Sequence, residues 1–318
     1  MPAERNAARW RNVDGILLLD KPEGLSSNAA LQSLRRLFNA RKAGHTGSLD
    51  PLASGLLPIC LGQATKVCGL LLGSNKTYRV TIILGDRTVT GDREGAVIEQ
   101  LPVPVLDART IRRVAESFLG ESEQVPPMYS ALKHQGERLY SLARKGIEVK
   151  RPARRIVVHR MELKGVEDRQ LHFEIECSKG TYIRSLAEDF ARACGTLGHV
   201  GSLCRLSLGP FVLPTMHALA DLERLAANPA ALEALLLPVD AALPGMPVVR
   251  LGRTESACVL QGQAVSVAGP NAARVRMYGE SGQFLGTGRM TPEGLRLAPE
   301  RIMVDIASAA SNPASNPA

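Results

Sequence analysis

The sequence predicts an α+β fold, with a mixed and largely antiparallel sheet, flanking helices and a smaller β-rich unit near the C-terminus. Residues 154–163 and 170–178 each show the apolar alternation of a strand, and together they predict a hairpin. A segment with helical spacing, 180–195, follows them. Past a proline-punctuated connection at 238–247, short strand patterns recur between turn sequences. Strands that form hairpins argue against a doubly wound parallel sheet.

Apolar spacing also defines the elements of the first hundred residues. Residues 15–24, GILLLDKPEG, predict a buried strand that runs into a Pro-Gly turn. Ser26 or Ser27 can cap the helix that follows, whose apolar residues recur on one face. Residues 76–84, KTYRVTIIL, alternate apolar and polar side chains, so we expect a strand with Tyr78 on its apolar side.

Later elements follow from the same patterns. A helix is expected over 107–120, with Gly120 as its C-cap. Three short strands are expected at 275–279, 284–290 and 295–304, separated by the turns ESGQ and TPEG. These patterns predict a mostly β unit at the C-terminal end.

The expected domain organisation uses these boundaries. Residues 13–246 are predicted to form one domain that carries a basic insertion at about 125–155, and residues 247–307 a second, smaller domain. Residues 1–12 and 308–318 are polar or of low complexity and cannot bury apolar surface, so we expect disordered tails.

Composition limits the class of protein. The 318 residues are 45% hydrophobic and 22% charged, which is typical of a folded chain. The 39 Lys and Arg exceed the 31 Asp and Glu, and the net charge of +8 favours a polyanionic partner such as nucleic acid. The six cysteines form no CxxC pair and no Cys/His zinc spacing, so we expect no metal and a reducing compartment. Neither a membrane-length apolar run nor a signal-peptide core is present, and we expect a cytoplasmic protein that does not bind membranes.

The stretch GHTGSLDPLASG, residues 44–55, holds three glycines and a single carboxylate, Asp50. It matches neither of the glycine-rich phosphate loops, GxxxxGK[ST] and GxGxxG, and His45 has no second zinc ligand at a usual spacing. Spacing alone leaves two interpretations open. Asp50 either caps a tight turn before Pro51, or it is a reactive carboxylate kept apart from other charges.

Residues 44–66 resemble the catalytic motif of the bacterial tRNA pseudouridine-55 synthases, the TruB-type family of pseudouridine synthases. Further segments match motifs of that family in the expected order, at 20–27, 76–92, 125–146, 177–189 and 203–211. The resemblance extends from residue 15 to about 305. It implies a pseudouridine-synthase core with a PUA-like C-terminal domain. The implied activity is that of an isomerase, an intramolecular transferase that converts uridine 55 in the T-loop of tRNA to pseudouridine by base flipping, without cofactor or metal.

The resemblance also implies roles for individual residues. Asp50 corresponds to the catalytic carboxylate and Arg184 to the cation that pairs with it, a role suited to a guanidinium fork that keeps its proton. Without the resemblance, Arg184 is equally well a surface arginine at the start of a helix. Asp50 can attack C1′, add to C6 or remove a sugar proton; we favour participation at the sugar.

The uracil pocket is expected to contain four further residues. Tyr78 corresponds to the ring that stacks on the flipped base, and its hydroxyl is a candidate proton acceptor at C5. Tyr182 corresponds to a second pocket tyrosine and Leu203 to a position that meets the uracil, although a strand tyrosine or lone leucine is ordinarily a core residue. His45 corresponds to the residue that fills the space left by the base and contacts the RNA.

Lys21, between a strand and a proline, corresponds to a structural or phosphate-facing partner near the site; the alternative is a solvated turn lysine.

Residues 133–160 carry nine Lys or Arg and two Glu, the densest positive stretch of the chain. Such a stretch is either a solvated face or a site that attracts phosphates. In the resembling family this region closes over the T-arm, so we expect RNA contacts from Lys133, Arg144, Lys145, Lys150 and Arg151. The PUA-like domain is expected to bind nearer the acceptor stem, and the protein to be a monomer. A second class of function remains possible on these observations: an RNA-binding or tRNA-folding module whose Asp50 site has no catalytic activity.

Overall fold

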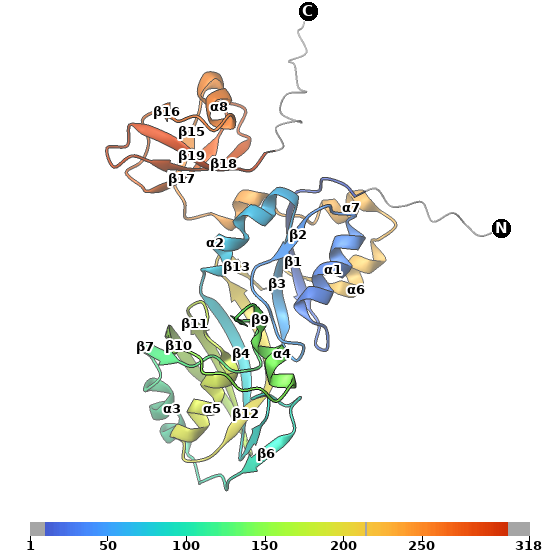
Figure 1. The fold of residues 1–318 in the computed structure, drawn as a ribbon, viewed down its shortest axis with the longest axis vertical. Coiled ribbons are helices and arrows are strands. Elements are labelled where there is room, and N and C mark those ends of the chain that lie inside the picture. The colour runs from blue at the N-terminus through green and yellow to red at the C-terminus, as the bar shows by residue number, and fades with distance from the viewer. Residues whose placement is uncertain (1–9, 214, 305–318) are drawn as a thin grey trace, which may run out of the picture.

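The computed structural model describes residues 10–213 and 215–304. Its main sheet comprises β1 (Gly15–Lys21), β2 (Ala43–His45), β3 (Ser54–Leu61), β4 (Lys76–Leu84), β7 (Gly120–Gln124), β10 (Arg154–Glu167), β11 (Gln170–Cys177), β12 (Gly198–Leu208), β13 (Phe211–Val212) and β14 (His217–Ala218). The strand order is β14-β1-β3-β12-β4-β11-β10-β7, with β2 paired to β3 and β13 to β12. Only the β1–β14 and β3–β12 pairs are parallel among these described strands. The sheet is therefore mixed and largely antiparallel, and the predicted α+β class is confirmed (Figure 1).

Helices cover the sheet, and short hairpins extend from it. The helical elements of the main body are α1 (Ser27–Leu37), the 3₁₀ helix η1 (Gly62–Val67), α2 (Cys68–Leu72), α3 (Ala108–Glu116), α5 (Ile183–Ala193), α6 (Leu219–Arg224), α7 (Pro229–Glu233) and η2 (Val239–Ala242). Between β4 and α3, β5 (Asp86–Thr88) pairs with β6 (Val97–Gln100). Between β7 and β10, β8 (Lys133–His134) pairs with β9 (Glu137–Arg138) and leads into α4 (Leu139–Arg144).

The strand β1 is buried on both faces, as its apolar run predicts. In β1, Leu17 and Leu19 face one core cluster, whereas Ile16 and Leu18 face another, because successive side chains of a strand point to opposite faces. In β4 one face carries polar side chains such as Thr77 and Arg79, and Tyr78 lies on the other, buried face as expected.

Two predicted helices form close to their expected ranges. The helix α1 begins after Ser26, whose hydroxyl accepts a hydrogen bond from the backbone N–H of Ala29 at 3.1 Å, so Ser26 is the N-cap. The helix α5 is shorter than the predicted 180–195 because the turn at Gly180 precedes it and Gly195, with φ +81°, ends it.

The prediction of a helix over 107–120 is wrong at its C-terminal end. α3 ends at Glu116 with Ser117 as its C-cap, and Gly120 is the first residue of β7 rather than a cap. Residues 120–124 pair with β10, and these sheet hydrogen bonds outweigh the weak local preference for a continued helix.

A second sheet of the described residues has the order β15-β17-β18-β19-β16, from β15 (Val248–Arg250), β16 (Val265–Ser266), β17 (Arg274–Tyr278), β18 (Phe284–Met290) and β19 (Arg296–Ile302). The three predicted strands are confirmed, but the sequence analysis missed α8 (Arg253–Leu260). Figure 1 shows this sheet beyond one end of the main sheet. The Nζ of Lys66 donates to the carbonyl of Ile302 at 2.5 Å, and Met303 packs into a core cluster of the main body.

The predicted tails lie mostly outside the described residues, which begin at residue 10 and end at 304. For residues 10–12 the prediction of disorder is wrong. The backbone N–H of Arg11 donates to Asn39 at 2.7 Å, and the carbonyl of Arg11 accepts from Arg41 at 2.9 Å. Among residues 10–213 and 215–304, no helix is both long and apolar enough to cross a membrane.

Candidate active site

The loop that carries Asp50 connects β2 to β3 and is tied down on both sides of the carboxylate. On one side, the Ser27 hydroxyl accepts from the backbone N–H of Leu49 at 2.7 Å and donates to its carbonyl at 2.9 Å. On the other, the carbonyl of Pro51 accepts from the backbone N–H of Gly24 at 2.8 Å and from the Lys21 ammonium at 3.4 Å. The position of Asp50 is therefore set by its two chain neighbours.

Arg184 approaches this carboxylate from the first turn of α5. Its Nε lies 2.9 Å from Asp50 Oδ2, and its side chain is only 5% exposed. Its Nη1 donates to the carbonyl of Thr90 at 2.7 Å and its Nη2 to that of Tyr129 at 2.6 Å. A second carboxylate oxygen, Asp92 Oδ2, lies 3.8 Å from Nη1. Arg184 is a buried and fixed cation, so the interpretation as a surface arginine is wrong.

The electrostatics of Asp50 combine opposing effects. Burial raises the pKa of the carboxyl and is the largest effect; the Arg184 guanidinium lowers it, and the charge of Asp92 raises it again. The side chain nevertheless keeps 40% of its surface exposed, although many protein atoms surround it. Water therefore screens part of these effects, and Arg184, with a smaller contribution from the charge of Lys21, favours the ionised form.

Tyr78 is buried in β4, 8% exposed, with a pKa raised mainly by burial. Arg205 lies directly opposite Tyr78 on β12, and its guanidinium opposes that rise of the pKa. Asp50 is also near enough to act on the phenol electrostatically. The structure thus places Tyr78 near Asp50, the carboxylate that Arg184 contacts.

Tyr182 lies directly before α5, two residues ahead of Arg184 in the chain. The buried amide of Gln124 binds both backbone groups of Tyr182, accepting from its N–H at 2.8 Å and donating to its carbonyl at 3.1 Å. Burial is the main cause that raises the pKa of the Tyr182 hydroxyl, and Ser130 and Asp50 are among the groups that act on it. Tyr182 therefore lies beside the same group of residues.

Lys21 is fully buried, and its ammonium donates to the carbonyls of Pro22 at 2.7 Å and Leu25 at 2.6 Å, besides Pro51. Burial lowers its pKa to about 8, partly offset by the charge of Asp50. The expectation of a solvated or phosphate-facing lysine is wrong for Lys21, because its donors are used by the loops on either side. Its structural role, the other expectation, agrees with these contacts.

His45 and Leu203 lie in less informative surroundings. His45 ends β2, and burial followed by the charge of Arg205 lowers its pKa; its Nδ1 is buried without a partner in the described residues. Leu203 is 6% exposed in β12, opposite Val80, within the main core cluster. Its side chain packs as a core residue does.

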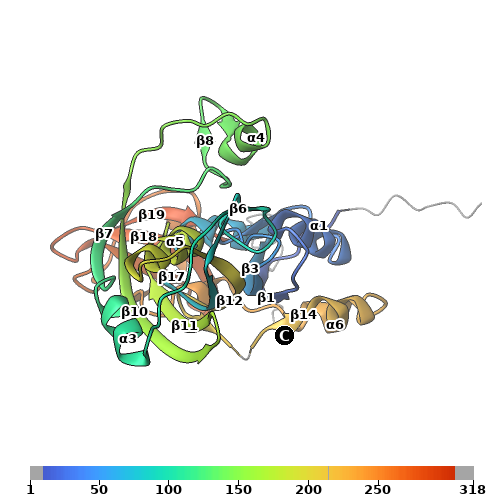
Figure 2. The same cartoon turned by 90° about the horizontal axis from the view of Figure 1, so that it is seen from below.

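The predicted RNA-contacting residues lie in the connection between β7 and β10. Figure 2 shows β8 and α4 of this segment projecting away from the main sheet. Lys133, Arg144, Lys145 and Lys150 are exposed, and Arg151 is partly buried. Two of the five are partly neutralised, since Lys145 lies 2.6 Å from Glu137 and Arg151 lies 3.2 Å from Glu148.

Four residues of the site were missed by the sequence analysis: Ser27, Asp92, Gln124 and Arg205. Arg205 had no local signal, because simple alternation places it on the same side of its strand as Ser207, and its burial becomes visible only in the structure. The others are ordinary loop, cap or strand residues whose partners lie far away in the sequence.

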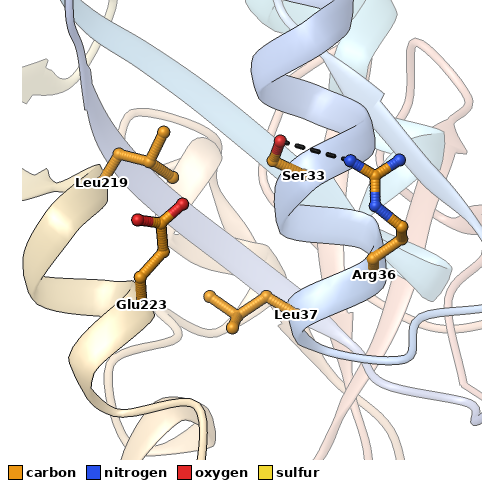
Figure 3. Close-up of a pocket in the computed structure, with 5 residues that line it drawn as sticks. All are labelled: Ser33, Arg36, Leu37, Leu219 and Glu223. Atoms are coloured by element: carbon orange, nitrogen blue, oxygen red, sulfur yellow. Dashed lines mark hydrogen bonds between the residues drawn. The ribbon is translucent and has the colours of Figure 1, made fainter.

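A hollow elsewhere on the surface contains none of the predicted residues. Figure 3 shows it between α1 and α6, where it is lined by Ser33, Arg36, Leu37, Leu219 and Glu223. Within residues 10–213 and 215–304, no group of three or more His, Cys, Asp and Glu side chains is arranged to hold a metal ion. The carboxylate of Asp50 and the phenol of Tyr78 are groups capable of acid–base and nucleophilic chemistry.

Comparison with known proteins agrees with this geometry. Three family sequence models match in succession: TruB family pseudouridylate synthase (N terminal domain) over residues 35–183, tRNA pseudouridylate synthase B C-terminal domain over 184–244, and Pseudouridine synthase II TruB, C-terminal, over 247–303. Proteins named tRNA pseudouridine synthase B from Nitrosococcus oceani and Chromohalobacter salexigens are 50% and 51% identical, over 92% and 95% of this chain and 96% and 98% of theirs.

A solved structure shares the fold. One chain in a crystal structure of a Cbf5-Nop10-Gar1 complex aligns with a TM-score of 0.71 and 25% identity, covering 93% of this chain and 86% of that one. Identity near one half over almost the whole length, with successive family matches, leaves one assignment: the chain belongs to the TruB family of pseudouridylate synthases.

Proposed function

We propose that this protein is a tRNA pseudouridine synthase that isomerises uridine 55 of the T-loop. The observation that carries the proposal is the contact of 2.9 Å between Asp50 and Arg184, at the centre of a tethered, glycine-rich loop. The substrate class is supported by relatives of about one-half identity that are named as tRNA pseudouridine synthases.

The chemistry needs only groups of this chain. The N1–C1′ bond breaks, the base turns, and a C5–C1′ bond forms; C5 loses a proton and N1 gains one, so the composition of the RNA is unchanged. Asp50 engages the sugar as nucleophile or base, and Arg184 keeps it ionised and oriented. Tyr78 stacks on the flipped uracil and accepts the C5 proton, with Tyr182, His45 and Leu203 around the base. Cofactor and metal are not required.

The RNA is held by surfaces outside the centre. The projecting segment between β7 and β10 closes over the T-arm, and its exposed lysines and arginines contact phosphates. The C-terminal sheet, within a domain of residues 247–307, is a PUA-like module that binds towards the acceptor stem; residues 13–246 form the catalytic domain. The enzyme works as a cytoplasmic monomer, a setting suited to its six free cysteines.

The proposal is tested by mapping pseudouridines on tRNA transcripts incubated with the purified protein. One modification at position 55 is expected, and a transcript with cytidine at that position is the matched control. Modification elsewhere would refute the substrate, and tight binding without any isomerisation would instead support an RNA-binding or tRNA-folding module.

A further inference from the structure

Arg205 is a buried cation whose role the mechanism above does not use. Its side chain is among the largest fully buried ones, 1% exposed, and the residues that the structure describes supply no carboxylate partner for it. Burying a guanidinium without a carboxylate partner costs free energy, which hydrogen bonds must offset. Such a residue is retained where it has a function. The surroundings of Arg205 therefore require an explanation.

Neutral acceptors from three parts of the fold surround the guanidinium. Its Nε donates to the carbonyl of Leu56 in β3 at 2.7 Å, and Nη2 donates to that of Gly47 in the Asp50 loop at 3.2 Å. The third neutral group is the phenol of Tyr78, which faces Arg205 across the two strands. Tyr78 is the residue directly opposite Arg205 in the antiparallel pairing of β4 with β12, so both side chains lie on the same face of the sheet.

We propose that Arg205 is a positioning residue for Tyr78. Its guanidinium, fixed by the carbonyls of Leu56 and Gly47, sets the orientation of the phenol and holds a positive charge beside the phenolic oxygen. The same contacts link that oxygen to the loop that carries Asp50. This inference rests on the proposed function, in which Tyr78 accepts the C5 proton of the uridine.

The charge matters because the other groups near Tyr78 act in the opposite direction. Burial raises its pKa most, and the side chains of Cys177 on β11 and Asp50 in the loop raise it further. Arg205 is the group that lowers it, by charge and by hydrogen bonding. Proton acceptance at C5 converts a phenolate to a phenol, and the phenol later releases that proton to water. A cation at this oxygen increases the phenolate population and leaves the proton balance unchanged.

A pH profile separates this role from simple packing. We compare wild type with Arg205→Met and Arg205→Lys, using single-turnover rates at saturating tRNA. Arg79→Met, which removes an exposed arginine from the same strand as Tyr78, is the matched control. Arg205→Met should move the rising limb of the rate profile upwards by about one pH unit or more, with Arg205→Lys intermediate. The affinity for tRNA should stay within about twofold because a side chain this buried reaches no phosphate. An unmoved limb in both Arg205 variants would overturn the inference.

Two further measurements keep the inference testable apart from the enzyme assay. Ultraviolet difference titration without RNA, with Tyr78→Phe subtracted, isolates the ionisation of Tyr78; it should shift upwards in Arg205→Met or, if that variant does not fold, in Arg205→Lys. In the Tyr78→Phe background, Arg205→Met should slow the reaction no further. An unshifted titration, or fully additive losses of rate, would overturn the inference. Since the titration needs no catalysis, a wild-type protein without isomerase activity would refute the proposed function while a shifted titration still supports the contact.

Discussion

Asp50→Asn changes one atom of the side chain and removes its charge and nearly all of its nucleophilicity and basicity. Arg184 should stay in place, because the carbonyls of Thr90 and Tyr129 hold it at 2.7 and 2.6 Å and Asp92 lies 3.8 Å away. The variant therefore tests the chemistry of Asp50 within an unchanged site.

Two effects of different size are expected. Loss of the reactive carboxylate should slow isomerisation by at least ~10²–10⁴-fold, the range typical of one acid–base group. The effect on stability should be small and of the opposite sign. Folding raises the pKa of Asp50 above 3.8. Between pH 3.8 and the folded-state pKa, the folded protein therefore binds this proton while the unfolded chain has released it. Stability declines as pH rises through that range. At neutral pH the asparagine variant should be as stable as wild type or more so, by less than about 1 kcal/mol because water screens a side chain that is 40% exposed.

The assay is tritium release from C5-labelled uridine in tRNA under single-turnover conditions, paired with filter binding and thermal unfolding of the same preparation. Binding should persist or strengthen slightly, since a negative charge facing the RNA is lost. A rate within tenfold of wild type in a folded, binding-competent variant would refute the catalytic role and would favour the turn-capping interpretation, because asparagine caps a turn as well as aspartate does.

Three other outcomes are expected. Replacing the basic residues of the projecting segment by alanine should weaken binding to all tRNAs and flatten the plot of log K against log salt by up to ~0.7–0.9 per lost phosphate contact, whereas an unchanged slope would mean a merely solvated face; the set is Arg144, Lys145, Lys150 and Arg151. Deleting residues 247–318 should reduce tRNA affinity more than the single-turnover rate at saturating RNA, and a collapsed rate would assign part of the active site to that region. Lys21 and Lys76, whose pKa values burial lowers to about 8, bind protons more weakly in the folded state, so stability should rise with pH between about 8 and 10.5. Lys21→Met should remove the share of Lys21 in that rise, up to about 3 kcal/mol of the free energy of unfolding measured in urea titrations. An undiminished rise would contradict a lowered pKa of Lys21 in the folded state.

What the sequence predicted well was whatever repeats locally. The alternation in 76–84 placed Tyr78 on the buried side of its strand, and one of the two serines offered as caps, Ser26, is the N-cap of α1. Contacts between distant segments were harder to predict. No local pattern tells that the Ser27 hydroxyl binds both backbone groups of Leu49, 22 residues away. Such contacts depend on the tertiary fold, and only the resemblance to a family gave access to the pairing of Asp50 with Arg184.

Lys21 and Gly120 illustrate why local rules fail. A lysine next to a proline in a turn is ordinarily solvated, yet three carbonyls surround Lys21 because two loops converge on it. A glycine after a helical pattern is ordinarily a cap, yet Gly120 begins a strand because β10 offers a pairing edge. For Gly120 a strand distant in sequence determined the outcome, whereas Lys21 is held by two carbonyls of its own turn and one of the Asp50 loop.

The parallel contact between β3 and β12 has a mechanical consequence. It is short, with Ser54 opposite Cys204 and Gly55 opposite Arg205, and it joins the strands on the Asp50 side of the sheet to those on the Tyr78 side. At Gly55 a Cβ atom would lie 2.4 Å from the carbonyl oxygen of Arg205, so the two backbones touch there without any intervening side chain. Heat or denaturant that parts this junction would separate the two halves of the reaction centre while the antiparallel ladders on either side stay intact. Inactivation would then precede loss of secondary structure, and the operating limit of the enzyme would be set by one short junction rather than by the stability of the whole fold.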